Sequence, residues 1–246
     1  MARFFLPGVA VSNEVTIVAD DAKHIARSLR MQPGETIEVV IAGQAYQAEL
    51  QTVSAEVVTA TLAQRLSDSE SPLEIYLYQA LPKGDKMELI IQKATELGVK
   101  EVIPLLSARV VVKWRHSAGE QRLQRWQRIA EEAAKQSRRS TIPTIRQPLP
   151  LRELPPDSGR LRLVAWEEAK QPLADLLTQH QPQAVEVVVG PEGGLDWDEA
   201  EFLAGIGFQS VSLGPRILRT ETAPLALLSV LQYQWGDLGG RTTCQR

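Results

Sequence analysis

The sequence contains little of several residue types on which whole classes of protein depend. Its 246 residues include one cysteine, Cys244, and three histidines. A single cysteine excludes an internal disulfide framework and a multi-cysteine metal site. Histidines, cysteines and carboxylates form no cluster with recognisable metal-ligand spacing, so we expect no metal ion.

Long apolar segments are missing as well. No apolar run approaches the roughly 20 residues that a membrane-spanning helix needs. The opening residues 1–7 have no apolar core of signal-peptide length. We therefore expect a cytoplasmic protein that makes no use of a membrane.

What is present is typical of a globular protein of one or two domains, with 43% hydrophobic and 23% charged residues. The net charge is −3, but residues 109–146 carry ten Lys and Arg against three Asp and Glu. Such a stretch indicates either a polyanionic partner, since phosphate attraction is local, or a solvated helix face. Charge alone leaves both readings open.

The first part of the chain is predicted to be rich in β-strands. Strand-like segments are 35–41, 45–53 and 57–62. A short helix before them begins after Asp20 or Asp21 and ends at Pro33-Gly34, with Ala22, Ile25, Ala26 and Leu29 on its apolar side. Residues 67–72 are polar and end in proline, which predicts a domain boundary and two domains, 1–70 and 73–246.

The second part alternates between strand and helix patterns. Strands are expected at 73–80, 99–105, 161–166, 185–189 and 210–213. Helices are expected after Gly84, over 120–137, after Pro172, after Asp196 and from Thr222 onward. Alternation of this kind indicates an α/β fold with a mainly parallel sheet and helices on both faces.

Three predicted loops follow strand ends, where open α/β sheets bind ligands. They are 165–168, the glycine-rich 190–194, and 213–223. Neither a dinucleotide-binding fingerprint nor a phosphate-binding Walker loop is present, which removes the main support for nicotinamide or nucleotide-hydrolysing chemistry. Each loop alone is also compatible with plain turn chemistry.

The loop residues Gly190-Pro191-Glu192-Gly193-Gly194 and Leu213-Gly214-Pro215-Arg216-Ile217-Leu218-Arg219-Thr220-Glu221-Thr222-Ala223 resemble the RsmE family. Its members are bacterial 16S rRNA uridine-N3 methyltransferases of the SPOUT superfamily. Further matches are 3–5, His24, 28–30, 83–86, 91–99 and 136–139. Lys135 and Arg138 depart from the family pattern, which usually has glutamate and often has glycine there.

The resemblance implies a PUA-like, RNA-binding β-barrel followed by a SPOUT α/β domain with a deep trefoil knot. It also implies S-adenosyl-L-methionine as cofactor, 16S rRNA of the assembled small ribosomal subunit as substrate, and a homodimer. Elementary folding rules would not suggest a knot, because threaded chains are nearly absent among folds.

Site residues follow from the loops and from the resemblance. The predicted cofactor-binding residues are Ala165, Trp166, Gly190, Pro191, Glu192, Gly193, Leu213, Gly214, Ile217, Leu218, Thr222 and Ala223. Arg219 is predicted to favour loss of the uridine N3 proton, because a cation stabilises the resulting negative charge. Glu221 is predicted to accept that proton or to hold Arg219, with helix N-terminal capping as the structural alternative.

The predicted RNA-contacting residues are Arg3, Lys23, Arg27, Arg30, Lys83, Lys86, Arg139 and Arg216. Two rival functions stay open. One is a non-catalytic ribosome-assembly factor that only holds RNA. The other is a SPOUT methyltransferase that acts on another RNA or another base position.

Overall fold

The computed structural model describes residues 1–8, 13–112, 114, 116–156 and 159–240. Cys244 and, from the basic stretch, Lys113 and Arg115 lie outside them. The chain forms two compact units: Met1–Glu70 with Ala134–Thr141, and Ser71–Ala133 with Ile142–Arg246. The sequence placed residues 134–141 in the second domain. The structure groups this segment with the first unit, to which hydrogen bonds connect it. Arg3 donates to the Arg139 carbonyl, and Glu70 accepts from the Arg139 side chain and from the Ser140 backbone N–H.

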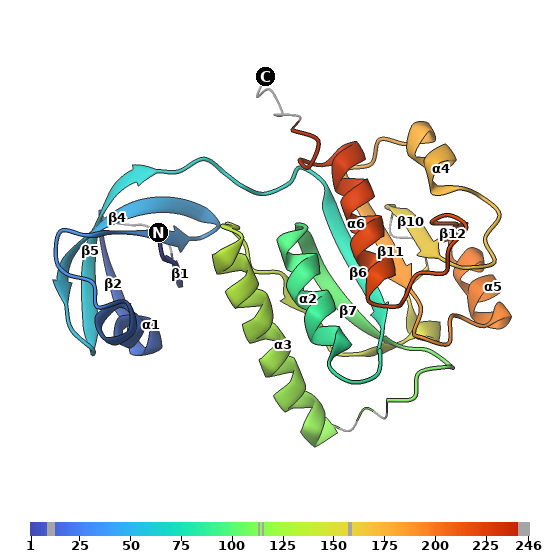
Figure 1. The fold of residues 1–246 in the computed structure, drawn as a ribbon, viewed down its shortest axis with the longest axis horizontal. Coiled ribbons are helices and arrows are strands. Elements are labelled where there is room, and N and C mark those ends of the chain that lie inside the picture. Colours follow the sequence, from blue (N-terminus) through green and yellow to red (C-terminus); the bar gives the residue numbers. More distant parts are fainter. Residues whose placement is uncertain (9–12, 113, 115, 157–158, 241–246) are drawn as a thin grey trace. The chain divides into compact units, whose positions relative to one another are not determined.

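The first unit is built on a curled sheet (Figure 1) that has five strands among the described residues. In the order β1-β3-β4-β5-β2, the strands are Arg3–Leu6, Thr36–Ile41, Gln44–Val53, Val57–Arg65 and Glu14–Val18. β1 pairs with β3 in parallel, and the other neighbours are antiparallel. Phe4, Ile37 and Leu50 are fully buried in its core. The three strands expected from sequence are confirmed, whereas β1 and β2 were not predicted.

The expected short helix is present but wound in two ways. Ala19–Lys23 is α-helical (α1), and His24–Leu29 forms a wider π-helix (η1). Ala22 and Ile25 are buried as expected, but Leu29 is 40% exposed. The placement of Leu29 on the apolar side was wrong because the wider turn shifts the face on which later residues lie.

The second unit contains a seven-stranded sheet within the described part of the chain, and its strand pairs are parallel. The order is β12-β10-β11-β6-β7-β8, and β9 also pairs with β7. The strands are β6 Glu74–Ala80, β7 Val99–Leu106, β8 Thr144–Ile145, β9 Leu149–Pro150, β10 Leu161–Ala165, β11 Ala184–Val189 and β12 Gln209–Val211. The five predicted strands are confirmed. The two-residue strands β8 and β9 were missed.

Helices cover both faces of this sheet, as predicted. They are α2 Lys86–Glu96, α3 His116–Gln136, α4 Leu173–Gln179, α5 Trp197–Gly205 and α6 Thr222–Trp235, with a short 3-10 turn at Leu151–Glu153. Along β6, Ile75 and Leu77 pack in the core that holds α2, α4 and α6, while Tyr76 and Tyr78 pack in the core on the α5 face. This alternation follows from side chains pointing to opposite faces of a strand.

Among the described residues, every helix is either too short or too polar to span a membrane.

Candidate active site

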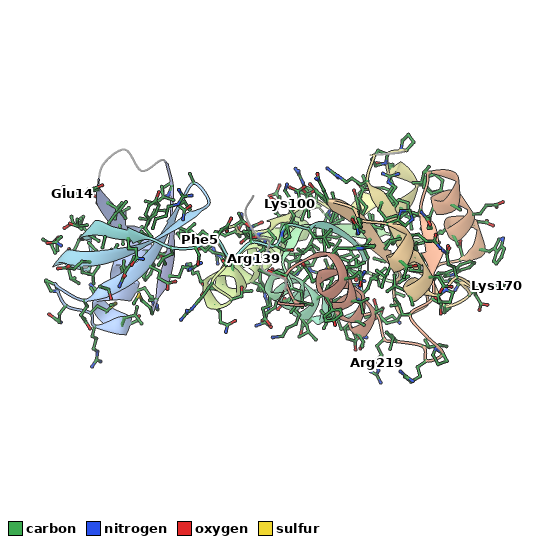
Figure 2. The ribbon with its side chains drawn as sticks, turned by 90° about the horizontal axis from the view of Figure 1, so that it is seen from above. Phe5, Glu14, Lys100, Arg139, Lys170 and Arg219 are labelled. Carbon is green, nitrogen blue, oxygen red and sulfur yellow. The ribbon has the colours of Figure 1, made fainter. Side chains whose placement is uncertain are left out.

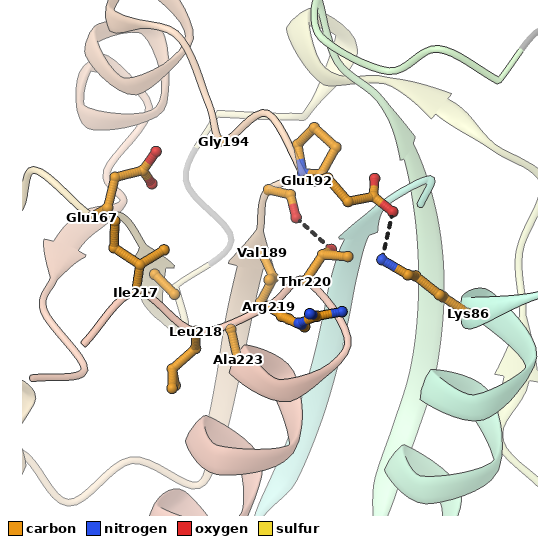
Figure 3. Close-up of a pocket in the computed structure, with 13 residues that line it drawn as sticks. Lys86, Glu167, Val189, Glu192, Gly194, Ile217, Leu218, Arg219, Thr220 and Ala223 are labelled. Atoms are coloured by element: carbon orange, nitrogen blue, oxygen red, sulfur yellow. Dashed lines mark hydrogen bonds and ion pairs between the residues drawn. The ribbon is translucent and has the colours of Figure 1, made fainter. Parts of the chain in front are cut away.

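Two adjoining pockets lie where β10, β11 and β12 end. The first measures about 320 Å³ and is lined by Lys86, Ala165, Glu167, Val189, Gly190, Pro191, Glu192, Gly194, Ile217, Leu218, Arg219, Thr220 and Ala223. The second measures about 300 Å³ and is lined by Ala165, Trp166, Glu167, Ser212, Leu213, Gly214, Pro215, Arg216, Ile217, Leu218 and Ala223. The two pockets share a wall, formed by Ala165, Glu167, Ile217, Leu218 and Ala223. Figure 3 shows the first pocket.

The structure brings together most of the residues that the sequence assigned to a cofactor. Gly193 and Thr222 line neither pocket in the described structure, whereas the other ten line at least one. Gly193 lies against Arg109, whose Nη1 donates a hydrogen bond to the Gly193 carbonyl at 2.7 Å. Thr222 is exposed as the first residue of α6.

One glycine of the loop at 190–194 has a steric reason to be glycine. Gly194 has a φ of +69°, and a Cβ there would lie 2.1 Å from Oε1 of Glu167. A larger residue would therefore be strained and would push Glu167 out of its place beside both pockets.

A chain of hydrogen bonds links the central strand to two loops. Gln79 of β6 is completely buried, and its Nε2 donates to Oγ1 of Thr220 at 3.2 Å. The Thr220 hydroxyl in turn donates to the Gly190 carbonyl at 2.9 Å. Sequence analysis missed both side chains. The available signal was a glutamine next to the end of a mostly apolar strand, since buried polar groups need partners.

Charged side chains meet at one side of the first pocket. Nζ of Lys86 lies 3.0 Å from Oε1 of Glu192 and 3.2 Å from Oε2 of Glu221. Lys86 was predicted to contact RNA. The structure instead places it in the pocket wall, with its ammonium between two carboxylates.

The acid–base properties of this group follow from its contacts. A hydrogen bond to Glu192 and then the ion pair with Glu221 raise the pKa of Lys86. Burial raises the pKa of Glu192, but hydrogen bonds from Lys86 and from backbone N–H groups outweigh it and leave that pKa below its ordinary value. The pKa of Glu221 is lowered by a hydrogen bond from its own backbone N–H and further by Lys86.

The two predicted catalytic residues differ in their surroundings. Arg219 is exposed at the margin of the second unit (Figure 2), and in Figure 3 its side chain extends toward the side where Lys86 lies. Glu221 occupies the N-cap position of α6, but its side chain makes no capping hydrogen bond in the described structure. Its ion pair is with Lys86, so the capping alternative is not what the geometry shows.

The remaining predicted RNA contacts fall into two groups. Lys23, Arg27, Arg30, Lys83 and Arg216 are exposed. Arg3 and Arg139 are only 8% and 5% exposed. Arg3 pairs with Glu38 at 2.8 Å, and Arg139 pairs with Glu70 at 2.6 Å. These two buried guanidinium groups are held by partners inside the first unit, which leaves little of either for RNA, and their contact with RNA stays a prediction.

The described residues hold no group of three or more histidines, cysteines and carboxylates that could bind a metal ion.

Comparisons with known proteins agree with this architecture. An RNA methyltransferase domain matches residues 69–232, and an RNA methyltransferase PUA domain matches residues 19–62. Ribosomal RNA small subunit methyltransferase E of Bacillus subtilis is 36% identical, and the match covers 92% of each chain. The Aquifex aeolicus protein of the same name is 34% identical over 86% of this chain and 90% of its own.

Solved structures show the same likeness. A crystal structure of ribosomal RNA small subunit methyltransferase E from Neisseria gonorrhoeae, bound to S-adenosyl methionine, superimposes with a TM-score of 0.86. It is 36% identical, and the match covers 96% of this chain and 99% of that one. The fold class predicted from the resemblance, a PUA-like domain followed by a SPOUT α/β domain, is confirmed. The chain belongs to the ribosomal RNA small subunit methyltransferase E family.

Proposed function

We propose that this protein transfers a methyl group from S-adenosylmethionine to N3 of a uridine in the 16S rRNA of the small ribosomal subunit. The observation that carries the proposal is the adjoining pair of pockets at the ends of β10, β11 and β12. Open α/β sheets bind their ligands at such strand ends. The family of the chain supplies the reaction class and the kind of RNA.

The pocket residues suit this cofactor. The two volumes, about 320 and 300 Å³, lie at the lower end of the range of pockets for small molecules. Leu213, Ile217 and Leu218 offer apolar walls for an adenine. Glu167 and Glu192 place carboxylates where a positively charged sulfonium would be favoured.

The cofactor, when bound, supplies an activated methyl carbon. The protein therefore has to orient the two reactants and to keep water from competing. Uridine N3 takes part in Watson–Crick pairing, so the target base has to be unpaired or swung out before it can enter. The N3 proton passes to water, the N3 electron pair forms the bond to the methyl carbon, and the electron pair of the broken sulfur–carbon bond stays on sulfur, which leaves as a neutral thioether.

Arg219 is proposed to favour loss of this proton, because an exposed cation at the pocket stabilises negative charge on the ring. Glu221 is a poor candidate for the proton acceptor. Its pKa is lowered, and a carboxylate with a low pKa is a weak base near neutral pH. We assign Glu221 to holding Lys86.

The proposal extends to partners. Family likeness favours the assembled small subunit as substrate and a homodimer as the working form, in the cytoplasm. Large apolar side chains are exposed near the pockets, among them Ile217 at 87% and Trp197 at 68%. Exposed apolar side chains of this size are typical of surfaces that bind another molecule.

Two measurements test the proposal. Calorimetric titration of the purified protein with S-adenosylmethionine should show saturable binding at one site per chain. Incubation with unmethylated small ribosomal subunits and the cofactor should yield 3-methyluridine, identified by mass spectrometry after digestion of the rRNA. RNA binding without cofactor binding would support the assembly factor instead. A different methylated nucleoside would move the activity to another target.

A further inference from the structure

Lys86 connects three segments that are far apart in the sequence. It is the first residue of α2 and follows the turn after β6. Glu192 lies in the loop after β11, and Glu221 lies in the loop before α6. One ammonium group therefore contacts carboxylates from two different loops, and Figure 3 shows the contact with Glu192.

A second contact strengthens this connection. Oε1 of Glu192 also accepts the backbone N–H of Lys83 at 3.0 Å. The carboxylate of Glu192 is thus bound twice to the segment between β6 and α2. The side chains of Lys86, Glu192 and Glu221 are 32%, 27% and 18% exposed, so water screens their charges only in part.

Without Lys86 the two carboxylates would face each other with no shared cation. Like charges at close range repel, and the loop at 190–194 would lose a tie to the loop at 213–221. Both loops contribute residues to the first pocket, including Gly190, Pro191, Leu218 and Arg219. The hydrogen bond from Thr220 to the Gly190 carbonyl ties these loops near the strand ends. Lys86 adds a second tie, at the edge of the cavity.

We propose that Lys86 is a positioning residue for the cofactor, which holds the Glu192 loop and the Glu221 loop at one fixed separation. The inference deepens the proposed function and rests on it. It replaces the expectation that Lys86 binds an RNA phosphate, because its ammonium is already shared by two carboxylates.

Lys83 provides the contrast. It lies three residues earlier, its side chain is exposed, and no ion pair of that side chain is found in the described structure. Its charge is free to meet a phosphate. The two lysines of one motif are therefore expected to act on different ligands.

The test compares Lys86→Met, Lys86→Arg and Lys93→Met, with calorimetric titration by S-adenosylmethionine in the absence of RNA. Lys93 is the matched control, since it lies on the same helix and pairs with Glu96 at 2.8 Å but lines neither pocket. We expect Lys86→Met to weaken cofactor binding about fivefold, as for a charge pair that water screens in part. Lys86→Arg should recover most of the loss, and Lys93→Met should match the parent protein.

Two further readouts separate positioning from other roles. The affinity for small ribosomal subunits and its salt dependence should be nearly the same for Lys86→Met and the parent. The double variant Lys86→Met/Glu221→Gln should bind the cofactor better than the product of the two single losses predicts, because removal of one carboxylate charge relieves the repulsion.

Unchanged cofactor affinity in Lys86→Met, together with weaker RNA binding and a shallower salt dependence, would overturn the inference in favour of a phosphate contact. If Lys86→Met does not fold, Glu192→Gln and Lys86→Arg carry the test: the first should weaken cofactor binding and the second should not. A parent protein that binds no cofactor would refute the proposed function itself. A parent that binds, with variants that bind equally well, would refute only the role of Lys86.

Discussion

Arg219 stands apart from the other cation of the first pocket. The charge of Lys86 is shared by Glu192 and Glu221, whereas the guanidinium of Arg219 is exposed beside them. Its backbone carbonyl accepts the N–H groups of Thr222 and Ala223 at 2.8 and 2.9 Å, which fixes the main chain where α6 begins. A fixed main chain with an exposed side chain is well suited to meet an incoming base.

This position makes Arg219→Lys informative. Lysine keeps the positive charge but loses the planar fork that can donate two hydrogen bonds at once. We expect kcat for methyl transfer to fall about tenfold, while the Kd for S-adenosylmethionine stays near that of the parent. Arg128→Lys, at an exposed position of α3, is the control. Turnover that stays near normal in Arg219→Lys would remove the orienting role assigned to Arg219.

Single residues also show how far the sequence could predict the site. The glycine-rich loop and the loop at 213–223 were identified because their residues are consecutive. The partners of Lys86 could not be identified, since Glu192 and Glu221 are separated from it by more than a hundred positions. The same limit explains Arg3 and Arg139: sequence shows a charge but not whether a distant carboxylate neutralises it.

At the scale of elements, prediction succeeded where hydrophobic periodicity is long. The strands β6, β7, β10 and β11 have five to eight residues and are bounded by turn residues. The strands β8 and β9 have two residues each, too few for any period to be visible. The π-helical turn at His24–Leu29 could not be predicted either, because its residues per turn differ from the α-helical period on which the prediction relied.

Glu70 holds the segment 139–141 to the first unit. Its carboxylate accepts a hydrogen bond from Nη2 of Arg139 at 2.6 Å. It also accepts hydrogen bonds from the backbone N–H groups of Ser140 and Thr141 at 2.8 and 3.1 Å. Glu70→Gln should lower the free energy of unfolding of the first unit by about 1–3 kcal/mol, the usual cost of removing a partly buried, charged hydrogen-bond acceptor. Urea denaturation at pH 7 measures this, with the exposed Glu56→Gln of the same unit as control.

The same residue predicts a pH dependence. Burial raises the pKa of Glu70, but hydrogen bonds and charge from Arg139 outweigh it, so the pKa in the folded protein is below the ordinary 4.5. The stabilisation is therefore complete above the unfolded-state pKa and is lost as the pH falls through the lower, folded-state pKa. The difference between the parent and Glu70→Gln should shrink below pH 4.5. A difference that is constant down to strongly acidic pH would contradict this assignment.

At the scale of the whole molecule, the charge pattern of the sequence overstates the basic character of residues 109–146. Arg125 pairs with Glu88, and Arg146 pairs with Glu101, each at 2.7 Å, in addition to the pair of Arg139 and Glu70. Carboxylates from other segments thus neutralise part of the stretch.

The trefoil knot stays an expectation from the family resemblance. No local residue pattern specifies how a chain passes through a loop.

The exposed cations of the first unit are better candidates for RNA than that stretch. Lys23, Arg27 and Arg30 lie within or directly beside the π-helical turn, and all three are exposed. Lys23 pairs with Asp20 at 3.1 Å, but its side chain is 57% exposed, so the pair is weak and open to exchange. Cations in this arrangement attract phosphates, and each phosphate contact adds to the salt dependence of binding.

The triple variant Lys23→Glu/Arg27→Glu/Arg30→Glu should therefore bind small ribosomal subunits more weakly at low salt. The slope of log affinity against log salt concentration should become shallower by about 2–3, which corresponds to the loss of three phosphate contacts. Cofactor affinity should not change, since none of the three residues lines a pocket. Arg65→Glu, exposed at the end of β5, is the control within the same unit. An unaltered slope in the triple variant would mean that these cations are only hydrated surface, and RNA recognition would then have to rest on the second unit, where Lys83 and Arg216 are exposed.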